Sequence, residues 1–158
     1  MPSTALTNAQ VVPNNAKLIR NALKQVLKDE PKLGDVKGWH NTLLSNKARL
    51  KPYGYVKFVQ RIPIPKHTDI HSFNYGYQFQ VGIIAELIGN EDDIDDLTLD
   101  LINLVESSIL VNKRLLDTVD LYNYEMTEGE DPDIVKYMPN HRHLWLKVTF
   151  TAYVQYDL

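Results

Sequence analysis

Four of the five histidines occur as two close pairs, and histidine is a common metal ligand in proteins. His67 and His71 are four residues apart, and His141 and His143 are two apart. If the two segments met, they could form a nitrogen-rich zinc site. However, His67 and His71 lie in a proline-containing loop, where a spacing of four does not align them, and no glutamate-bearing helical zinc motif is present. We therefore interpret all four as surface-loop histidines and predict no metal site.

A cluster of carboxylates lies in the segment 90–96, which is Asn-Glu-Asp-Asp-Ile-Asp-Asp. A calcium loop needs oxygen ligands at alternating positions, a glycine at the turn and a closing glutamate. Ile94 interrupts this run, and the glycine is missing. Negative charge is favourable in the first turn of a helix, because the N-terminal end of the helix dipole is positive. The cluster therefore indicates the beginning of a helix.

Serine and glutamate side chains form no recognisable catalytic arrangement. Glu86 follows a predicted strand and Glu125 lies in another, so a carboxylate pair is conceivable, although solvent-facing positions explain both. The chain has no glycine-rich phosphate loop, and no serine stands in a nucleophile elbow. The serines considered are Ser3, Ser45, Ser72, Ser107 and Ser108. We predict a protein that is not an enzyme and needs no cofactor.

Composition limits the class of protein. The 158 residues carry a net charge of -3, which excludes a global basic field that would attract nucleic acid. The chain has no cysteine, so disulfides and thiolate metal sites are excluded. No apolar run reaches the roughly 20 residues of a membrane span, and the N-terminus does not resemble a secretion signal. We expect a protein kept in a cytoplasm, with a loose arm at 1–14 and one domain at 15–158.

Two long segments alternate between apolar and polar residues, which is typical of strands. In 144–156 the even positions share one face, and in 75–87 the odd positions do. Residues 35–52 have no decisive period. The expected elements are a helix from Asn14 or Asn15 to about Lys28, a strand at 53–62, a strand at 73–87, a helix at 94–110, a strand at 119–126 and a final strand from 144, with polar loops at 63–72 and 127–143.

This order of elements, α-β-β-α-β-β, predicts an α+β fold with a mostly antiparallel sheet and both helices packed on one face. In the first strand, Val56, Phe58 and Ile62 could share a face, and Pro63 and Pro65 should end the strand.

Aromatic side chains gather on the predicted strands. Tyrosine is favoured in strands, so packing in the core is one interpretation. Tyr and Trp are also enriched in protein interfaces, which makes them candidate subunit or partner contacts. Gly54, Gly76 and Gly82 would allow a close approach to the backbone or a bulge. The candidate interface residues are Tyr53, Tyr55, Tyr75, Tyr77, Tyr137, Trp145, Tyr153 and Tyr156.

The order and size of these elements resemble those of one protein family. An amphipathic helix leads to Pro-Tyr-Gly-Tyr-Val at 52–56, then to the long strand at 75–87 and the helix opened by acidic residues. The chain ends in a strand finishing Thr-Ala-Tyr-Val-Gln-Tyr-Asp-Leu. From about residue 15 to residue 158, the chain resembles the tail terminator, or tail completion, proteins of long-tailed bacteriophages.

The resemblance implies a homo-oligomeric ring, usually a hexamer, that caps the head-proximal end of the tail tube. Such a ring would contact the tail tube protein and a neck or connector protein in the virion, and would be assembled in the host cytoplasm. DNA would pass through its lumen without specific binding, which agrees with the acidic balance. The implied contact regions are the hairpin 53–87, the loop 127–142 and the last strand.

Two alternatives remain open at this point. The chain could be a different neck or connector protein of a phage, since such proteins share α+β elements and ring assembly. It could also be a small metal-dependent enzyme that uses the aspartate and histidine clusters. The loops at 63–72 and 127–143 are candidate contacts to a sheath or neck protein, or plain insertions.

Overall fold

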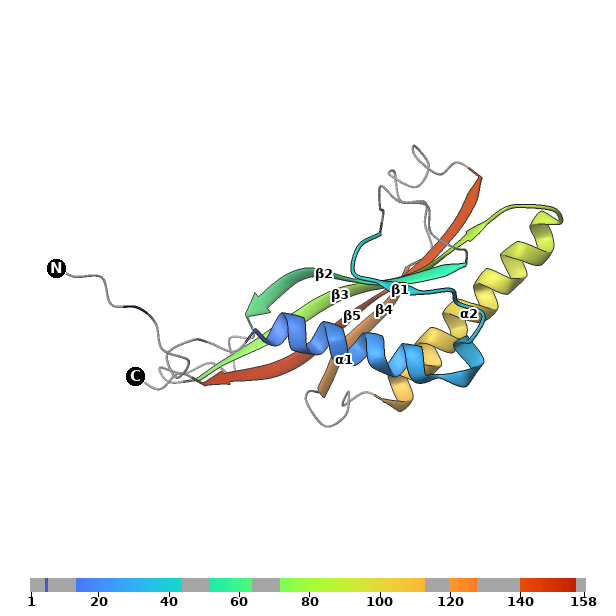
Figure 1. The fold of residues 1–158 in the computed structure, drawn as a ribbon. Coiled ribbons are helices and arrows are strands. Elements are labelled where there is room, and N and C mark those ends of the chain that lie inside the picture. Colours follow the sequence, from blue (N-terminus) through green and yellow to red (C-terminus); the bar gives the residue numbers. More distant parts are fainter. Residues whose placement is uncertain are drawn as a thin grey trace.

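The structure is a computed structural model that describes residue 5 and residues 14–43, 52–63, 72–112, 120–127 and 140–155. Within these residues, a five-stranded sheet is accompanied by two long helices (Figure 1). The elements are α1 (Asn15–Asp29), the short 3-10 helix η2 (Pro31–Leu33), β1 (Trp39–His40), β2 (Tyr53–Pro63), β3 (Ser72–Glu86), α2 (Glu91–Val111), β4 (Asp120–Thr127) and β5 (His141–Gln155).

The sheet has the strand order β1-β2-β3-β5-β4, and only the short β1 lies parallel to its neighbour. At its centre, β3 and β5 pair antiparallel along their whole length, from Ser72 opposite Gln155 to Glu86 opposite His141. Fifteen residues of strand span about 50 Å, whereas the 21 residues of α2 span about 31 Å. The fold is therefore α+β with a mostly antiparallel sheet, as the sequence predicts.

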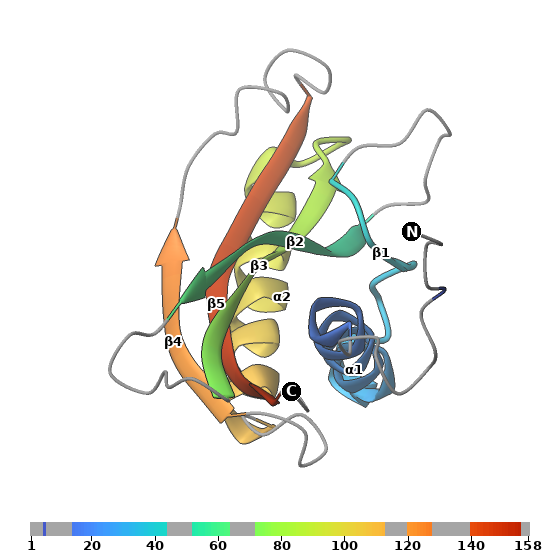
Figure 2. The same ribbon diagram turned by 90° about the vertical axis from the view of Figure 1, so that its left-hand side faces the viewer.

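One face of the central strands forms the main core. The odd residues of β3 meet the even residues of β5, as in the cross-strand pairs Phe79–Val148 and Val81–Leu146. Buried side chains of α1 and α2 belong to this same cluster, so both helices cover this face. Figure 2 shows α2 running behind β3 and β5, with α1 beside it. The predicted core-facing positions are confirmed for residues 77–83 of β3 and 144–150 of β5.

Polar side chains determine where the two helices begin. Asn14 Oδ1 accepts the backbone N–H of Lys17 at 3.2 Å, so the capping residue is Asn14. In α2 the cap is Asn90, whose Oδ1 accepts the N–H of Asp92 at 3.0 Å and that of Asp93 at 3.4 Å. Because this cap precedes the acidic run, α2 begins three residues earlier than the periodicity of its apolar residues predicts.

A bulge in β2 changes which residues face the core. Phe58 lies opposite Phe79 and Gln60 lies opposite Gln78, so Val59 is an extra residue in this ladder. Beyond the bulge, Ile62 lies opposite Gly76, which belongs to the other face of β3. The expectation that Ile62 shares a face with Val56 and Phe58 is therefore wrong, because one extra residue inverts a two-residue alternation.

Other boundaries also differ from the expected ones. The ambiguous stretch after α1 contains β1, a two-residue strand that pairs with Gly54 and Tyr55 of β2. Strand β5 begins at His141, so the histidine pair belongs to a strand instead of a loop. The loop segments 64–71 and 128–139, with His67, His71 and Tyr137, lie outside the described residues. In the described part of the chain, no helix is long and apolar enough to cross a membrane.

Candidate interaction surfaces

On the sheet face that the helices do not cover, the ring of Tyr55 crosses β3. A Cβ atom placed on Gly82 would lie 2.6 Å from Cε1 and Oη of Tyr55, so only glycine leaves room for this ring. Similarly, a Cβ on Gly54 would lie 2.3 Å from the ring of Trp39. The close approach that we expected at Gly54 and Gly82 is thus confirmed, and each glycine accommodates a ring from the neighbouring strand.

The hydroxyl of Tyr55 joins three strands. The amide nitrogen of Gln80 on β3 donates to Tyr55 Oη at 2.7 Å, and Tyr55 Oη lies 2.6 Å from Nε2 of His143 on β5. Since Oη accepts the Gln80 hydrogen, its own hydrogen is available to donate to Nε2. Tyr55 is fully buried and His143 is 3% exposed. The prediction of a surface-loop histidine is wrong for His143, because its imidazole is a partner in this buried network.

The structure places three of the candidate interface tyrosines inside the chain itself. Tyr53, Tyr55 and Tyr77 are each at most 3% exposed, and the hydroxyl of Tyr53 donates to the carbonyl of Leu43 at 3.0 Å. For these three the packing interpretation holds. Tyr75 and Trp145 are half-buried. Tyr137 and Tyr156, and the side chain of Tyr153, lie outside what the structure describes.

The acidic and histidine residues do not converge within the described residues. No group of three or more His, Asp or Glu side chains there could hold a metal ion. Glu86 lies opposite His141 and Glu125 lies opposite Lys147, positions that are about 20 Å apart along β5. Asp95 pairs instead with the guanidinium of Arg142 at 2.7 Å. The first turn of α2 contains Glu91, Asp92 and Asp93, a placement that the helix dipole favours.

Strand β2 divides into a buried inner half and an exposed outer half. Residues 53–56 are buried, whereas every residue from 57 to 63 is exposed. The outer half nevertheless carries three large apolar side chains, Phe58, Val59 and Ile62, each between 37% and 40% exposed. Beside them, the guanidinium of Arg61 lies 4.2 Å from the ring centre of Tyr75. Within the described residues, β1 covers only Gly54 and Tyr55, so the outer half is paired on one side alone.

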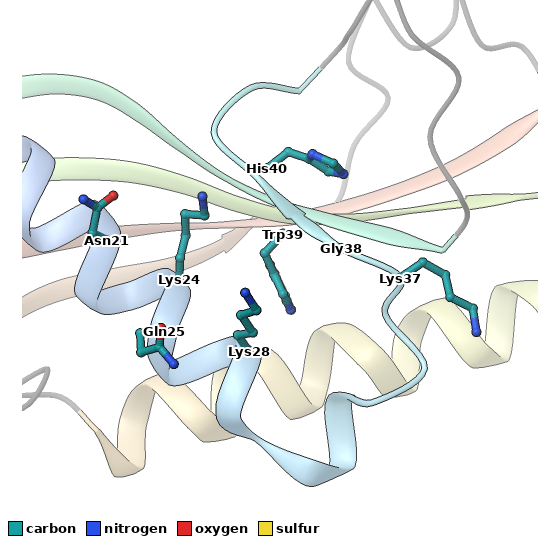
Figure 3. Close-up of a pocket in the computed structure, with 8 residues that line it drawn as sticks. All are labelled: Asn21, Lys24, Gln25, Lys28, Lys37, Gly38, Trp39 and His40. Carbon is teal, nitrogen blue, oxygen red and sulfur yellow. The ribbon is translucent and has the colours of Figure 1, made fainter.

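A cavity of about 500 Å³ lies between α1 and β1, and three of the eight described residues that line it are lysines. Figure 3 shows the side chains of Lys28 and Trp39 approaching each other from α1 and β1, whereas Lys37 points away. No carboxylate lines the cavity among the described residues. The lining residues are Asn21, Lys24, Gln25, Lys28, Lys37, Gly38, Trp39 and His40.

The positive charge of this cavity is not neutralised within the described chain. Lys24 donates to the side-chain oxygen of Asn41 at 2.8 Å, an amide that carries no charge. Partial burial of the ammonium lowers the pKa of Lys24, and the nearby charges of Arg20 and Lys28 lower it further. Sequence reasoning missed this cavity, although the spacing of the cations along α1 was a visible signal.

Comparisons with known proteins add little to this description. No protein-family model matches the sequence, and no functionally curated protein does. Among solved structures, the chain is similar to one from the virion of a native gene transfer agent particle. The identity is 10% and the TM-score is 0.41, over 87% of this chain and 94% of the other. A likeness this weak supports no argument about function.

Proposed function

We propose that this chain is a structural subunit of a phage-like virion, and that several copies form the ring that terminates a tail tube. The resemblance of the sequence to tail terminator proteins supports the proposal. The described order of helices and strands agrees with the order on which that resemblance rests. The finer statements, namely a hexamer, a neck partner and a DNA-conducting lumen, belong to the same proposal.

The exposed outer half of β2 is the observation that carries the proposal. Exposed apolar side chains on a strand segment that lacks a second neighbour are candidate contacts with another chain. Here the exposed segment 57–63 contains Phe58 and Ile62 on opposite faces of β2, with Val59 at the bulge between them. A strand segment that is paired on one side only is also a template for pairing with another chain. A neighbouring subunit or the tail tube protein would cover this segment.

Features of the same strand limit how it can be covered. Lys57, the bulge at Val59 and Pro63 are devices that discourage uncontrolled edge-to-edge pairing. The contact would therefore use the side chains of the outer half more than its backbone. Tyr75 and Trp145 remain candidate contacts in this proposal, since both are half-buried in the single chain.

The test combines particle mass with electron microscopy. The purified protein should form rings of several subunits, either alone or when short tail tubes are added, and it should stop further growth of the tubes. Binding to portal-bearing capsids without binding to tubes would indicate the connector alternative. A protein that stays monomeric with and without tubes, and that binds zinc stoichiometrically, would overturn the proposal in favour of the enzyme alternative.

Two single substitutions test the surface. Ile62→Ser should leave the fold intact and weaken ring formation, because Ile62 is exposed and would lose apolar contact with a neighbour. Val111→Ser is the matched control, since Val111 is 83% exposed at the far end of α2. Equal assembly of both variants and the wild type would exclude the outer half of β2 from the contact.

A further inference from the structure

A basic stripe, defined as Arg20, Lys24 and Lys28, lies along one side of α1. The three residues are four apart, so their side chains follow one another on successive turns over about 12 Å. In the described residues none of them pairs with a carboxylate. Arg20 and Lys24 donate to the amide oxygens of Asn21 and Asn41. Like charges at this spacing repel one another, so the helix carries a cost that an acidic partner would relieve.

An acidic stripe, defined as Asp92, Asp96 and Asp100, lies along α2. These residues are also four apart, are all exposed, and cover the same length of about 12 Å. They lie on the side of α2 opposite the residues that it buries, such as Leu101 and Val105. Among the described side chains none of the three has a cationic partner, and Arg142 is engaged by Asp95 instead.

The two stripes cannot meet within one copy of this fold. The buried residues of α1 and α2 share one core cluster, which fixes the rotation of each helix about its axis. The acidic stripe then points to solvent, whereas Lys24 and Lys28 of the basic stripe line the cavity between α1 and β1. Any contact between them therefore requires a second molecule.

We propose that the basic stripe of one copy binds the acidic stripe of a second copy. The stripes match in length, in spacing and in number of charges, and they have opposite sign. They are different surfaces of the chain, so each copy can offer one stripe to each of two neighbours. Such a head-to-tail contact generates a ring if the rotation closes. The inference rests on the proposed ring and names one contact within it.

Zero-length cross-linking is the direct test. A carbodiimide joins a lysine amine to an aspartate carboxylate only when the two are in contact, and an equal mixture of ¹⁵N-labelled and unlabelled protein identifies links between copies. We expect mixed-isotope peptides that join Lys24 or Lys28 to Asp96 or Asp100. Assembled protein without these links would overturn the inference, while the proposed ring would stand.

Charge variants provide the second test. Lys24→Gln with Lys28→Gln, and separately Asp96→Asn with Asp100→Asn, should each weaken self-association at least ~10-fold. An equal mixture of the two variants retains one intact contact, so it should form mixed pairs that do not grow further. Lys32→Gln and Asp35→Asn are the matched controls, because both residues are exposed and belong to neither stripe. Association of the stripe variants at wild-type strength would overturn the inference.

Salt and particle shape separate the two proposals. The contact should weaken between 0.1 M and 1 M salt, where the screening length falls from about 10 Å to about 3 Å. Rings that persist in 1 M salt and show no stripe cross-links would support the ring and overturn the stripe contact. Stripe cross-links in particles that are only dimers would support the stripe contact and overturn the ring.

Discussion

The hydroxyl of Tyr55 lies 2.6 Å from Nε2 of His143, although the two residues are 88 positions apart in the chain. The contact connects β2 to β5 across β3, and Gln80 on β3 donates to the same hydroxyl. Both rings are buried. A polar network of this kind stabilises a strand register when every member has a partner, and it is costly when one is removed.

Removal of this hydroxyl should destabilise the fold. In Tyr55→Phe the ring still fills its place over Gly82, but Nε2 of His143 loses this partner in a buried site. We expect a loss of about 1–3 kcal/mol in the free energy of unfolding, measured by urea denaturation. Tyr75→Phe, at a half-buried position, is the control and should change this free energy much less. A Tyr55→Phe protein as stable as the wild type would contradict the role of the network.

A methyl group at Gly82 should displace the Tyr55 ring. The new Cβ would lie 2.6 Å from Cε1 of Tyr55, closer than such contacts occur in proteins. We expect Gly82→Ala to lower the thermal midpoint and to cost about 1–3 kcal/mol of stability, because the packed core cannot absorb the extra volume. Gly38→Ala is the control, since its Cβ would meet only the tip of His40 at 3.2 Å. Equal effects of the two substitutions would argue against the crossing of the ring.

The beginning of α2 should depend on Asn90. Its Oδ1 accepts two backbone N–H groups of the first turn, so Asn90→Ala should cost about 0.5–2 kcal/mol. Hydrogen exchange should show the loss as faster exchange at Asp92 and Asp93. Asn103→Ala, at an exposed position within α2, should not destabilise, because alanine is the better helix former there. Unchanged exchange in Asn90→Ala would show that the acidic residues suffice to begin the helix.

The burial of Lys24 beside the cavity between α1 and β1 should be measurable as a lowered pKa of its ammonium group. The pKa of Lys24 is lowered in the folded chain, so the unfolded chain holds more protons between the two pKa values and stability rises with pH in that window. Competitive acylation should give a lower midpoint for Lys24 in the native protein than in urea. Lys28→Gln removes one nearby positive charge, so it should raise the pKa of Lys24 in the native protein toward the value in the unfolded chain. Lys32→Gln is the control. If it shifted the pKa of Lys24 as much as Lys28→Gln does, the lowered pKa would not be caused by the neighbouring charge of Lys28.

Much of the fold could be predicted because its strands are long and lie between two different environments. The alternation marks the core face over 13 residues in each of the segments 75–87 and 144–156, so the existence and facing of β3 and β5 were evident. β1 has only two residues, too few for any period, and the bulge at Val59 leaves no mark in the sequence of β2. These two features were therefore missed.

The candidate surfaces also combine features that are visible in the sequence with features that depend on the fold. The spacing of Arg20, Lys24 and Lys28 is visible in the sequence, but the cavity requires β1 to lie beside α1. Eight aromatic positions looked equivalent as interface candidates, and only burial separates Tyr53, Tyr55 and Tyr77 from Tyr75 and Trp145. The exposure of Phe58 and Ile62 could not be foreseen, because strand alternation alone predicts one of the two faces to be buried.

By itself, the sequence determines the class of fold, the core faces of the two long strands and the approximate starts of both helices, although it did not identify Asn90 as the cap of α2. Each of these depends on residues that are near one another in the chain, where periodicity and capping act. The tertiary structure alone decides that His143 is buried against Tyr55, that the outer half of β2 stays open, and that the charged stripes of α1 and α2 face different surroundings. Those outcomes depend on contacts between distant segments, which no local pattern records.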